Sequence, residues 1–141
     1  MKTRLSGKVL VLTGAGGGIG RAVAEKLAGH GMKAVLLGGR NGKKLDETRA
    51  AVEKSAPCLV LPGDLTDPDF IASGVAEALR TFGGIDVLVN NAGAAQSTPF
   101  EEVSLAEFDR LMAVNVRAPF CLTQACLPHL RKSAEIGRAH V

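Results

Sequence analysis

Aromatic residues are scarce in this sequence, which contains five phenylalanines and neither tryptophan nor tyrosine. No apolar run approaches the length of a membrane span, and the stretch Met1 to Gly7 is short and polar, with no signal-peptide core behind it. The lack of a membrane-length apolar run argues against a membrane-spanning protein, and the lack of a signal-peptide core argues against a secreted one. We therefore predict a cytoplasmic protein.

Cysteine is also scarce, and neither sign of charge predominates. Cys58, Cys121 and Cys126 are odd in number and lack C-x-x-C spacing, which argues against a zinc site and against a disulfide framework. A reducing compartment is the simpler interpretation. The formal net charge is +3 and the basic residues are scattered, so we expect neither a nucleic-acid surface nor a polybasic membrane patch.

Glycine, by contrast, is abundant, and its first cluster follows a strand. The chain has 141 residues, 17 of them glycine, and is 46% hydrophobic, which is enough for one domain with a modest core. The unbroken apolar run Val9 to Leu12 is typical of a strand buried on both faces. A helix is predicted after the glycines, because Ile19, Val23 and Leu27 recur every fourth residue and mark its inward face.

The turn between this strand and this helix suits a phosphate group. Its spacing is T-G-x-x-x-G-x-G, from Thr13, Gly14, Gly18 and Gly20, whereas Ile19 stands at the third glycine of the commoner G-x-G-x-x-G. No lysine follows as it would in a nucleoside-triphosphate P-loop. Free backbone N–H groups and the helix dipole favour a dinucleotide pyrophosphate here. The alternative is a turn with only a structural role.

The second strand, predicted over Ala34 to Leu37, ends where dinucleotide folds bind the adenosine ribose. The stretch Gly38 to Asn41 that follows has no carboxylate for a free 2′-hydroxyl. Arg40 can instead pair with a 2′-phosphate, helped by Lys43 or Lys44. NADP is therefore favoured over NAD. The alternative is that these basic side chains are merely solvated.

Strands and helices continue to alternate along the chain. We predict helices over 42–55, 68–82 and 105–130 and strands over 58–61 and 85–89. Four strands without a hairpin signal describe an α/β fold with a doubly wound parallel sheet. Ligands of such sheets bind at the carboxyl ends of the strands.

Polar residues lie at those ends. Asp64 and Leu65 follow the third strand, and Asn90 to Gly93 follow the fourth. A lone acid after a strand either caps a turn or helix or, here, contacts adenine, and both remain open for Asp64. With the glycine turn and Arg40, these residues are expected to converge on one crevice.

These motifs together resemble the short-chain dehydrogenase/reductase (SDR) family, which has the Rossmann fold. TGAGGGIG at Thr13 to Gly20 is similar to its cofactor motif, NNAG at Asn90 to Gly93 to its fourth-strand motif, and Asp64-Leu65 to its adenine-side acid. With Arg40, the implied cofactor-binding set is Thr13, Gly14, Gly18, Ile19, Gly20, Arg40, Asp64, Leu65, Asn90, Ala92 and Gly93. Four of these, Gly14, Gly18, Ile19 and Gly20, would approach the pyrophosphate, and Asn90, Ala92 and Gly93 would line the cofactor near its ribose.

Asn115 resembles the asparagine of the family's catalytic tetrad. The resemblance implies that Asn115 bends its helix and holds a water through its carbonyl. The alternative is a local kink caused by Pro119, which has no N–H and so frees the Asn115 carbonyl.

Family members transfer a hydride between a nicotinamide cofactor and a carbonyl or alcohol substrate. A tyrosine serves as acid or base, a lysine lowers the pKa of that tyrosine, and a serine polarises the substrate oxygen. This sequence has no tyrosine, and it ends before the fifth strand that would carry the serine and the Y-x-x-x-K helix. We therefore expect an inactive fragment, truncated after the fourth strand and its helix, of an enzyme that forms a dimer or tetramer when complete.

The last residues offer a reason for the truncation. Ile136 to Val141 resemble a translated sequencing adaptor, so we expect an incomplete domain over 1–135 and a non-native tail over 136–141. A natural C-terminus is the alternative. Truncation before the fifth strand would leave the fourth strand as an uncovered sheet edge. We therefore expect the 141-residue chain to be poorly soluble or molten.

Two other functions stay open. A non-catalytic sensor or scaffold would bind the dinucleotide without performing chemistry. The epimerase-like branch of the superfamily has T-G-x-x-G-x-x-G spacing, which Gly17 and Gly20 also satisfy. The NNAG turn and the helix with Asn115 favour the dehydrogenase branch.

Overall fold

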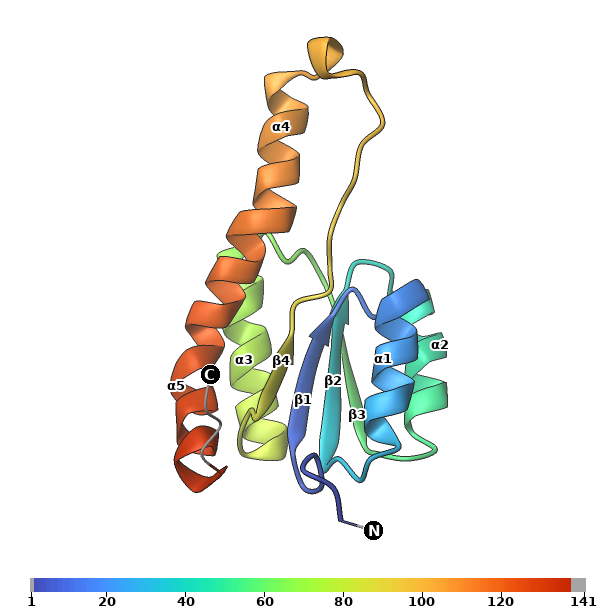
Figure 1. Ribbon diagram of the computed structural model, residues 1–141, viewed down its shortest axis with the longest axis vertical. Helices are drawn as coiled ribbons and strands as arrows, with labels where there is room; N and C mark the ends of the chain where they lie inside the picture. The colour runs from blue at the N-terminus through green and yellow to red at the C-terminus, as the bar shows by residue number, and fades with distance from the viewer. Residues whose placement is uncertain (1, 138–141) are drawn as a thin grey trace.

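The computed structural model describes residues 2–137, which form a parallel β-sheet between two layers of helices (Figure 1). The strands are β1 (Val9–Thr13), β2 (Ala34–Gly39), β3 (Cys58–Pro62) and β4 (Val87–Val89). The helices are α1 (Gly18–Ala28), α2 (Gly42–Val52), α3 (Pro68–Phe82), α4 (Leu105–Met112) and α5 (Ala118–Gly137). A short 3-10 helix, Phe100–Glu102, precedes α4, and a π-helical segment, Ala113–Arg117, joins α4 to α5.

The strand order is β3-β2-β1-β4, with all pairs parallel. The chain proceeds outward from β1 to β3 and then returns to the other side of β1, so the direction of winding reverses between β1 and β4. This arrangement confirms the predicted doubly wound α/β fold. The point of reversal is where such sheets bind their ligands.

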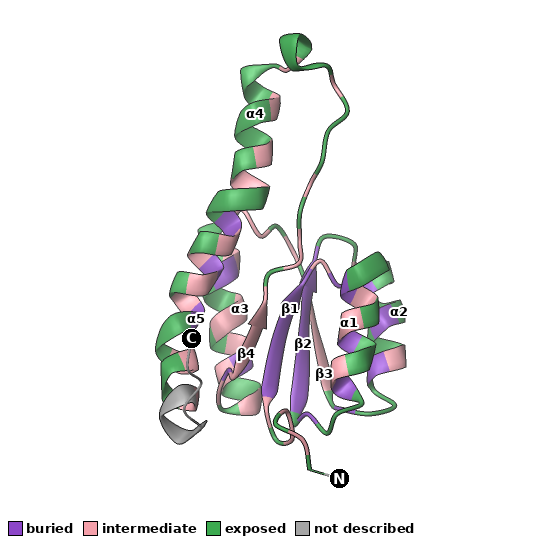
Figure 2. Cartoon of the chain, viewed as in Figure 1, coloured by how far each residue is buried: buried purple, intermediate pink, exposed green. Residues whose placement is uncertain are grey.

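Two apolar clusters cover the two faces of the sheet. Alternate side chains of β1, such as Leu10 and Val11, point to opposite faces. The first cluster joins the sheet to α1 and α2 through Ala24, Ala28, Leu45 and Val52. The second joins it to α3 and α5 through Ile71, Ala78, Leu122 and Cys126. The central strands β1 and β2 are therefore buried along their whole length (Figure 2).

β4 is shorter than predicted. Ile85 is buried, but strand pairing begins only at Val87. Between them, Asp86 takes both backbone bonds of Val9: its carboxylate accepts from the Val9 N–H at 2.7 Å, and its own N–H donates to the Val9 carbonyl at 3.0 Å. The Asp86 carboxylate thus takes the place of a backbone carbonyl at the start of the β1–β4 pairing.

The predicted inward face of α1 is correct at Val23 and Leu27, which are partly buried against the first apolar cluster, and wrong at Ile19. Ile19 is 76% exposed, and the buried residues are Gly20, Ala24 and Ala28. The most deeply buried positions follow the predicted ones by one residue, about 100° around the helix, so the inward face is broader than predicted. The reason is steric: α1 lies so close to the glycine turn that a Cβ on Gly20 would overlap the Gly14 carbonyl oxygen.

The predicted helix over 105–130 is interrupted. In the π segment the Ala118 N–H donates to the Ala113 carbonyl, five residues earlier, and Pro119 follows at once. α4 projects beyond the carboxyl ends of the strands (Figure 1), and none of its residues is buried. The predicted tail over 136–141 lies partly outside the described residues, since α5 is described as far as Gly137.

Candidate functional site

A cleft of about 400 Å³ lies at the carboxyl ends of the strands. It is bounded by the turn after β1, the end of β2, the segment after β3, the turn after β4, and the helical run of α4. Its lining comprises Gly14, Gly39, Arg40, Asp64, Leu65, Thr66, Asn91, Ala92, Gly93, Ala94, Arg110 and Val114.

Six residues of the predicted set line this cleft, namely Gly14, Arg40, Asp64, Leu65, Ala92 and Gly93. Thr13 and Asn90 instead line a smaller adjoining pocket. Gly18, Ile19 and Gly20 form the first turn of α1 and line neither of these two pockets. The expected crevice is therefore present, and it is lined by part of the predicted set.

The glycine turn is shaped by close contacts. Gly14 has a φ of +65°, and a Cβ there would lie 2.8 Å from the backbone of Ala92. Around Gly17 and Gly18, by contrast, an added Cβ would meet nothing within 4 Å. No side chain caps α1 at Gly17, so the first-turn N–H groups have no partner within their own helix and no capping group. This open backbone suits an anion such as a pyrophosphate.

Hydrogen bonds tie the turn after β1 to the turn after β4. Thr13 Oγ1 accepts from the N–H groups of Asn91 at 3.2 Å and Ala92 at 3.1 Å, while Asn91 Nδ2 donates to the Gly14 carbonyl at 3.1 Å. Thr13 is only 3% exposed, so it acts here as a structural clamp beneath the cleft. Asn91 was missing from the predicted set, although it stands within the NNAG motif that supplied its neighbours.

A second clamp comes from α2. The hydroxyl of Thr48 donates to the Ala15 carbonyl at 2.7 Å and is fully buried. Sequence reasoning missed this contact. Its signal was a threonine between Leu45 and Val52 on the inward face of a helix, where a polar group needs a partner.

The side chain of Asn115 holds the segment after the NNAG turn. Asn115 Oδ1 accepts from the Ala94 N–H at 2.8 Å, and Asn115 Nδ2 donates to the Ala94 carbonyl at 2.7 Å. Asn90 donates from Nδ2 to Thr123 Oγ1 on α5 at 3.0 Å. The β4 turn is thereby fixed to both the π segment and α5. The predicted role of the Asn115 carbonyl toward a water stays a prediction.

At the outer rim of the cleft, two residues of the predicted set pair with each other. Arg40 Nη2 donates to Asp64 Oδ1 at 3.1 Å, and the same oxygen accepts from the Thr66 N–H at 2.9 Å and the Thr66 hydroxyl at 2.7 Å. The Thr66 hydrogen bonds, followed by that of Arg40, lower the pKa of Asp64 from 3.8 to about 2. The bond to the N–H two residues on makes Asp64 a turn-forming residue, the first of its two predicted roles.

The charge of the cleft is mixed and positive in balance. Arg40 and Arg110 line it opposite the single carboxylate of Asp64. The two lysines expected to assist Arg40, Lys43 and Lys44, are absent from its lining. The guanidinium groups that line the cleft, and separately the free N–H groups at the start of α1, can each bind a phosphate.

Two further observations concern other classes of protein. Among residues 2–137 no three His, Cys, Asp or Glu side chains are grouped so as to hold a metal ion. Within the same residues, no helix has both the length and the apolar character to cross a membrane.

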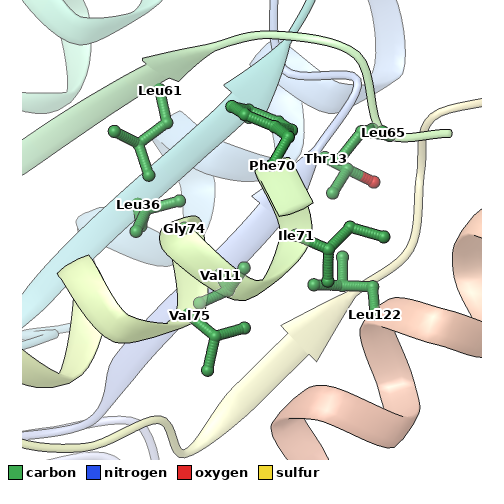
Figure 3. A pocket seen from close by; sticks show the side chains of 11 residues that line it. Val11, Thr13, Leu36, Leu61, Leu65, Phe70, Ile71, Gly74, Val75 and Leu122 are labelled. Carbon is green, nitrogen blue, oxygen red and sulfur yellow. The ribbon is translucent and has the colours of Figure 1, made fainter. Parts of the chain in front are cut away.

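A smaller apolar cavity of about 30 Å³ lies between the sheet and α3 and shares Leu65 with the cleft (Figure 3). Its lining includes Leu36, Leu61, Phe70 and Gly74, and Thr13 supplies the one side-chain oxygen near it. A void this small and apolar is a packing defect and not a ligand site.

Comparison with known proteins gives consistent matches. The sequence model of a family described as short chain dehydrogenase matches residues 8–138. Hydroxysteroid dehydrogenase-like protein 2 from Bos taurus is 38% identical over 140 residues, which are 92% of this chain and 33% of that protein. The chain therefore spans about a third of the length of this relative.

Two solved structures are similar in both fold and sequence. L-Sorbose reductase from Gluconobacter frateurii, complexed with NADPH and L-sorbose, has a TM-score of 0.86 at 32% identity, covering 94% of this chain and 51% of that one. NADH-dependent reductase A1-R′, complexed with NAD, has a TM-score of 0.85 at 32% identity, covering 94% and 55%. The chain spans about half of each.

Proposed function

Because this chain belongs to the short-chain dehydrogenase family, we propose that it forms the dinucleotide-binding part of an NAD(P)-dependent oxidoreductase. The complete protein would transfer a hydride between the nicotinamide and a carbonyl or alcohol group of a small molecule. The single observation that carries this proposal is the cleft at the carboxyl ends of the strands, with an uncapped helix N-terminus beside it.

The residues present fit such a ligand. The open backbone at Gly17 and Gly18 suits the pyrophosphate, and Ile19 and Gly20 add N–H groups of the same helix turn. The adenosine end would lie toward Arg40, Asp64 and Leu65. The nicotinamide ribose would lie toward the turn Asn90 to Gly93. When bound, the cofactor supplies the hydride or accepts it.

We propose NADP as the preferred cofactor. Arg40 lines the cleft. The residue after it is Asn41 and not a carboxylate, and its side chain accepts a hydrogen bond from the Lys44 N–H as the N-cap of α2. A guanidinium group pairs with a phosphate through charge-assisted hydrogen bonds. The two similar structures hold NADPH and NAD respectively, so this preference rests on Arg40 alone.

The substitution Gly17→Asp tests the proposed phosphate site. The backbone of Gly17 is extended and open, so an aspartate fits there, and it would cap α1 with a negative charge. We expect isothermal titration to show loss of NADPH and NADH binding, while the thermal midpoint stays equal or rises. Gly84→Asp is the matched control, because an added Cβ at Gly84 also meets nothing within 4 Å and lies far from the cleft. Unchanged cofactor binding in Gly17→Asp would reject the site.

We further propose that these residues alone do not catalyse the reaction. The sequence contains no tyrosine to serve as acid or base, although Asn115 matches one member of the family's tetrad. The same observation favours the second candidate, a non-catalytic protein that binds the dinucleotide as a sensor or scaffold. Sequencing the gene beyond this region would distinguish the two candidates. A serine and a Y-x-x-x-K motif there would favour the enzyme, and their absence would favour the sensor or scaffold.

The remaining expectations also stand as proposals. Exposed apolar side chains follow one side of α4 and the start of α5, and they support a homo-oligomer of the complete protein; they are Leu105, Phe108, Met112, Val116 and Phe120. We call this set the apolar stripe. The domain limits of 1–135, the non-native tail and the cytoplasmic location stay predictions.

A further inference from the structure

The cation that the proposed function assigns to a 2′-phosphate already has a partner. Arg40 Nη2 lies 3.1 Å from Asp64 Oδ1, across the rim of the cleft. The two residues come from the ends of neighbouring strands, β2 and β3. Their side chains are 69% and 49% exposed, so a ligand in the cleft can reach both.

Of the two partners, Asp64 is the fixed one. Its Oδ1 atom accepts two hydrogen bonds from Thr66, one of them from the backbone. The carboxylate is consequently tied to the segment that leads into α3. Arg40 makes no other side-chain hydrogen bond among the described residues, and its long side chain can turn toward another acceptor.

We propose that Asp64 limits the selectivity of this site for NADP by competing with the 2′-phosphate for Arg40. The inference rests on the proposed function. A ligand with a 2′-phosphate must take Arg40 from Asp64 and must also lie beside a fixed negative charge. A ligand with a free 2′-hydroxyl leaves the Arg40–Asp64 pair intact and brings no second negative charge close to Asp64. Exposed ion pairs are weak, so the competition amounts to about two- to fivefold in affinity.

The substitution Asp64→Asn separates this role from the others. An asparagine keeps an oxygen for the Thr66 N–H but removes the charge that holds Arg40. The probes are adenosine 2′,5′-bisphosphate and 5′-AMP, which differ only in the 2′-phosphate, titrated calorimetrically into the 141-residue chain. We expect Asp64→Asn to bind the bisphosphate about two- to fivefold more tightly and to leave 5′-AMP unchanged.

Asp67→Asn is the matched control. Asp67 is also exposed, and its substitution changes the net charge by the same amount. It caps α3, however, and does not line the cleft. Its affinities for both probes should equal those of the wild type. Measured against Arg40→Ala, the double variant Arg40→Ala/Asp64→Asn should gain less affinity for the bisphosphate than Asp64→Asn gains against the wild type, because only the repulsion is relieved and no guanidinium is released.

Three results would overturn the inference. Equal weakening of both probes by Asp64→Asn would assign the carboxylate to the adenosine itself. Equal tightening in Asp67→Asn would reduce the effect to net charge, and unchanged binding in Asp64→Asn would show no competition. The failure of the proposed function looks different, since a wild-type chain that binds neither probe and neither NADPH nor NADH rejects both proposals.

Discussion

At the scale of single residues, the cleft is held by side chains that contact backbone atoms of distant segments. Asn91 bonds the carbonyl of Gly14, Thr48 that of Ala15, and Asn115 both polar groups of Ala94. Each such bond contributes about 1 kcal/mol. Their combined effect is to fix the turns after β1 and β4 before any ligand arrives.

The pH dependence of stability should report on Asp64. Its pKa is lowered from 3.8 to about 2 by Thr66 and then by Arg40, so the folded state favours the ionised carboxylate. This contribution is fully present above about pH 4, and it is lost as the pH falls toward 2. We expect urea unfolding of Asp64→Asn to show a shallower loss of stability in that window than the wild type. An identical slope in both proteins would contradict this.

At the scale of elements, the helices pack on the two faces of the sheet with side chains of different size. α1 lies close because its buried face consists of Gly20, Ala24 and Ala28. α3 packs with larger side chains and leaves the small apolar cavity near Gly74 (Figure 3). The face of the sheet that α3 covers therefore has room for a methyl group at this point.

Gly74→Ala should stabilise the fold. A Cβ at this helix-interior position would lie 3.5 Å from Leu61 Cδ1, an ordinary van der Waals contact. Replacing a helical glycine by alanine gains about 1 kcal/mol, because the unfolded chain loses freedom. Urea denaturation measures the change. The comparison is Gly63→Ala, which should destabilise because its Cβ would overlap the ring of Phe70.

At the scale of the whole molecule, α4 is unlike the rest of the chain. It stands beyond the sheet and buries none of its residues (Figure 2). It nevertheless carries Leu105, Phe108 and Met112 of the apolar stripe. Phe108 and Phe120, at 52% and 65% exposure, lie on this stripe. Apolar surface of this kind associates in water, because its burial removes it from solvent.

We expect the 141-residue chain to self-associate through the apolar stripe. The double variant Phe108→Glu/Phe120→Glu should shift sedimentation velocity profiles toward the monomer, because a carboxylate resists burial in an apolar contact. Phe100→Glu is the control, since Phe100 is 93% exposed but lies in the 3-10 helix before α4. Equal dissociation by the control variant would remove the stripe from the explanation.

The sequence by itself determined the order of the elements, the parallel doubly wound sheet and the positions of the glycine turn and the NNAG turn. These features follow from apolar runs, helical periodicity and glycine spacing, which are local properties of the chain. The inward face of α1 has the predicted period, although Ile19 at its start is exposed.

Only the tertiary structure decided which side chains meet. Arg40 pairs with Asp64 across 24 residues of sequence, and Asn115 holds Ala94 across 21. Such contacts depend on strand order and register, which bring the ends of β2 and β3 side by side. Local patterns predicted that Arg40 and Asp64 share one crevice, but they do not specify side-chain distances, and for that reason the ion pair between the two residues could not be foreseen.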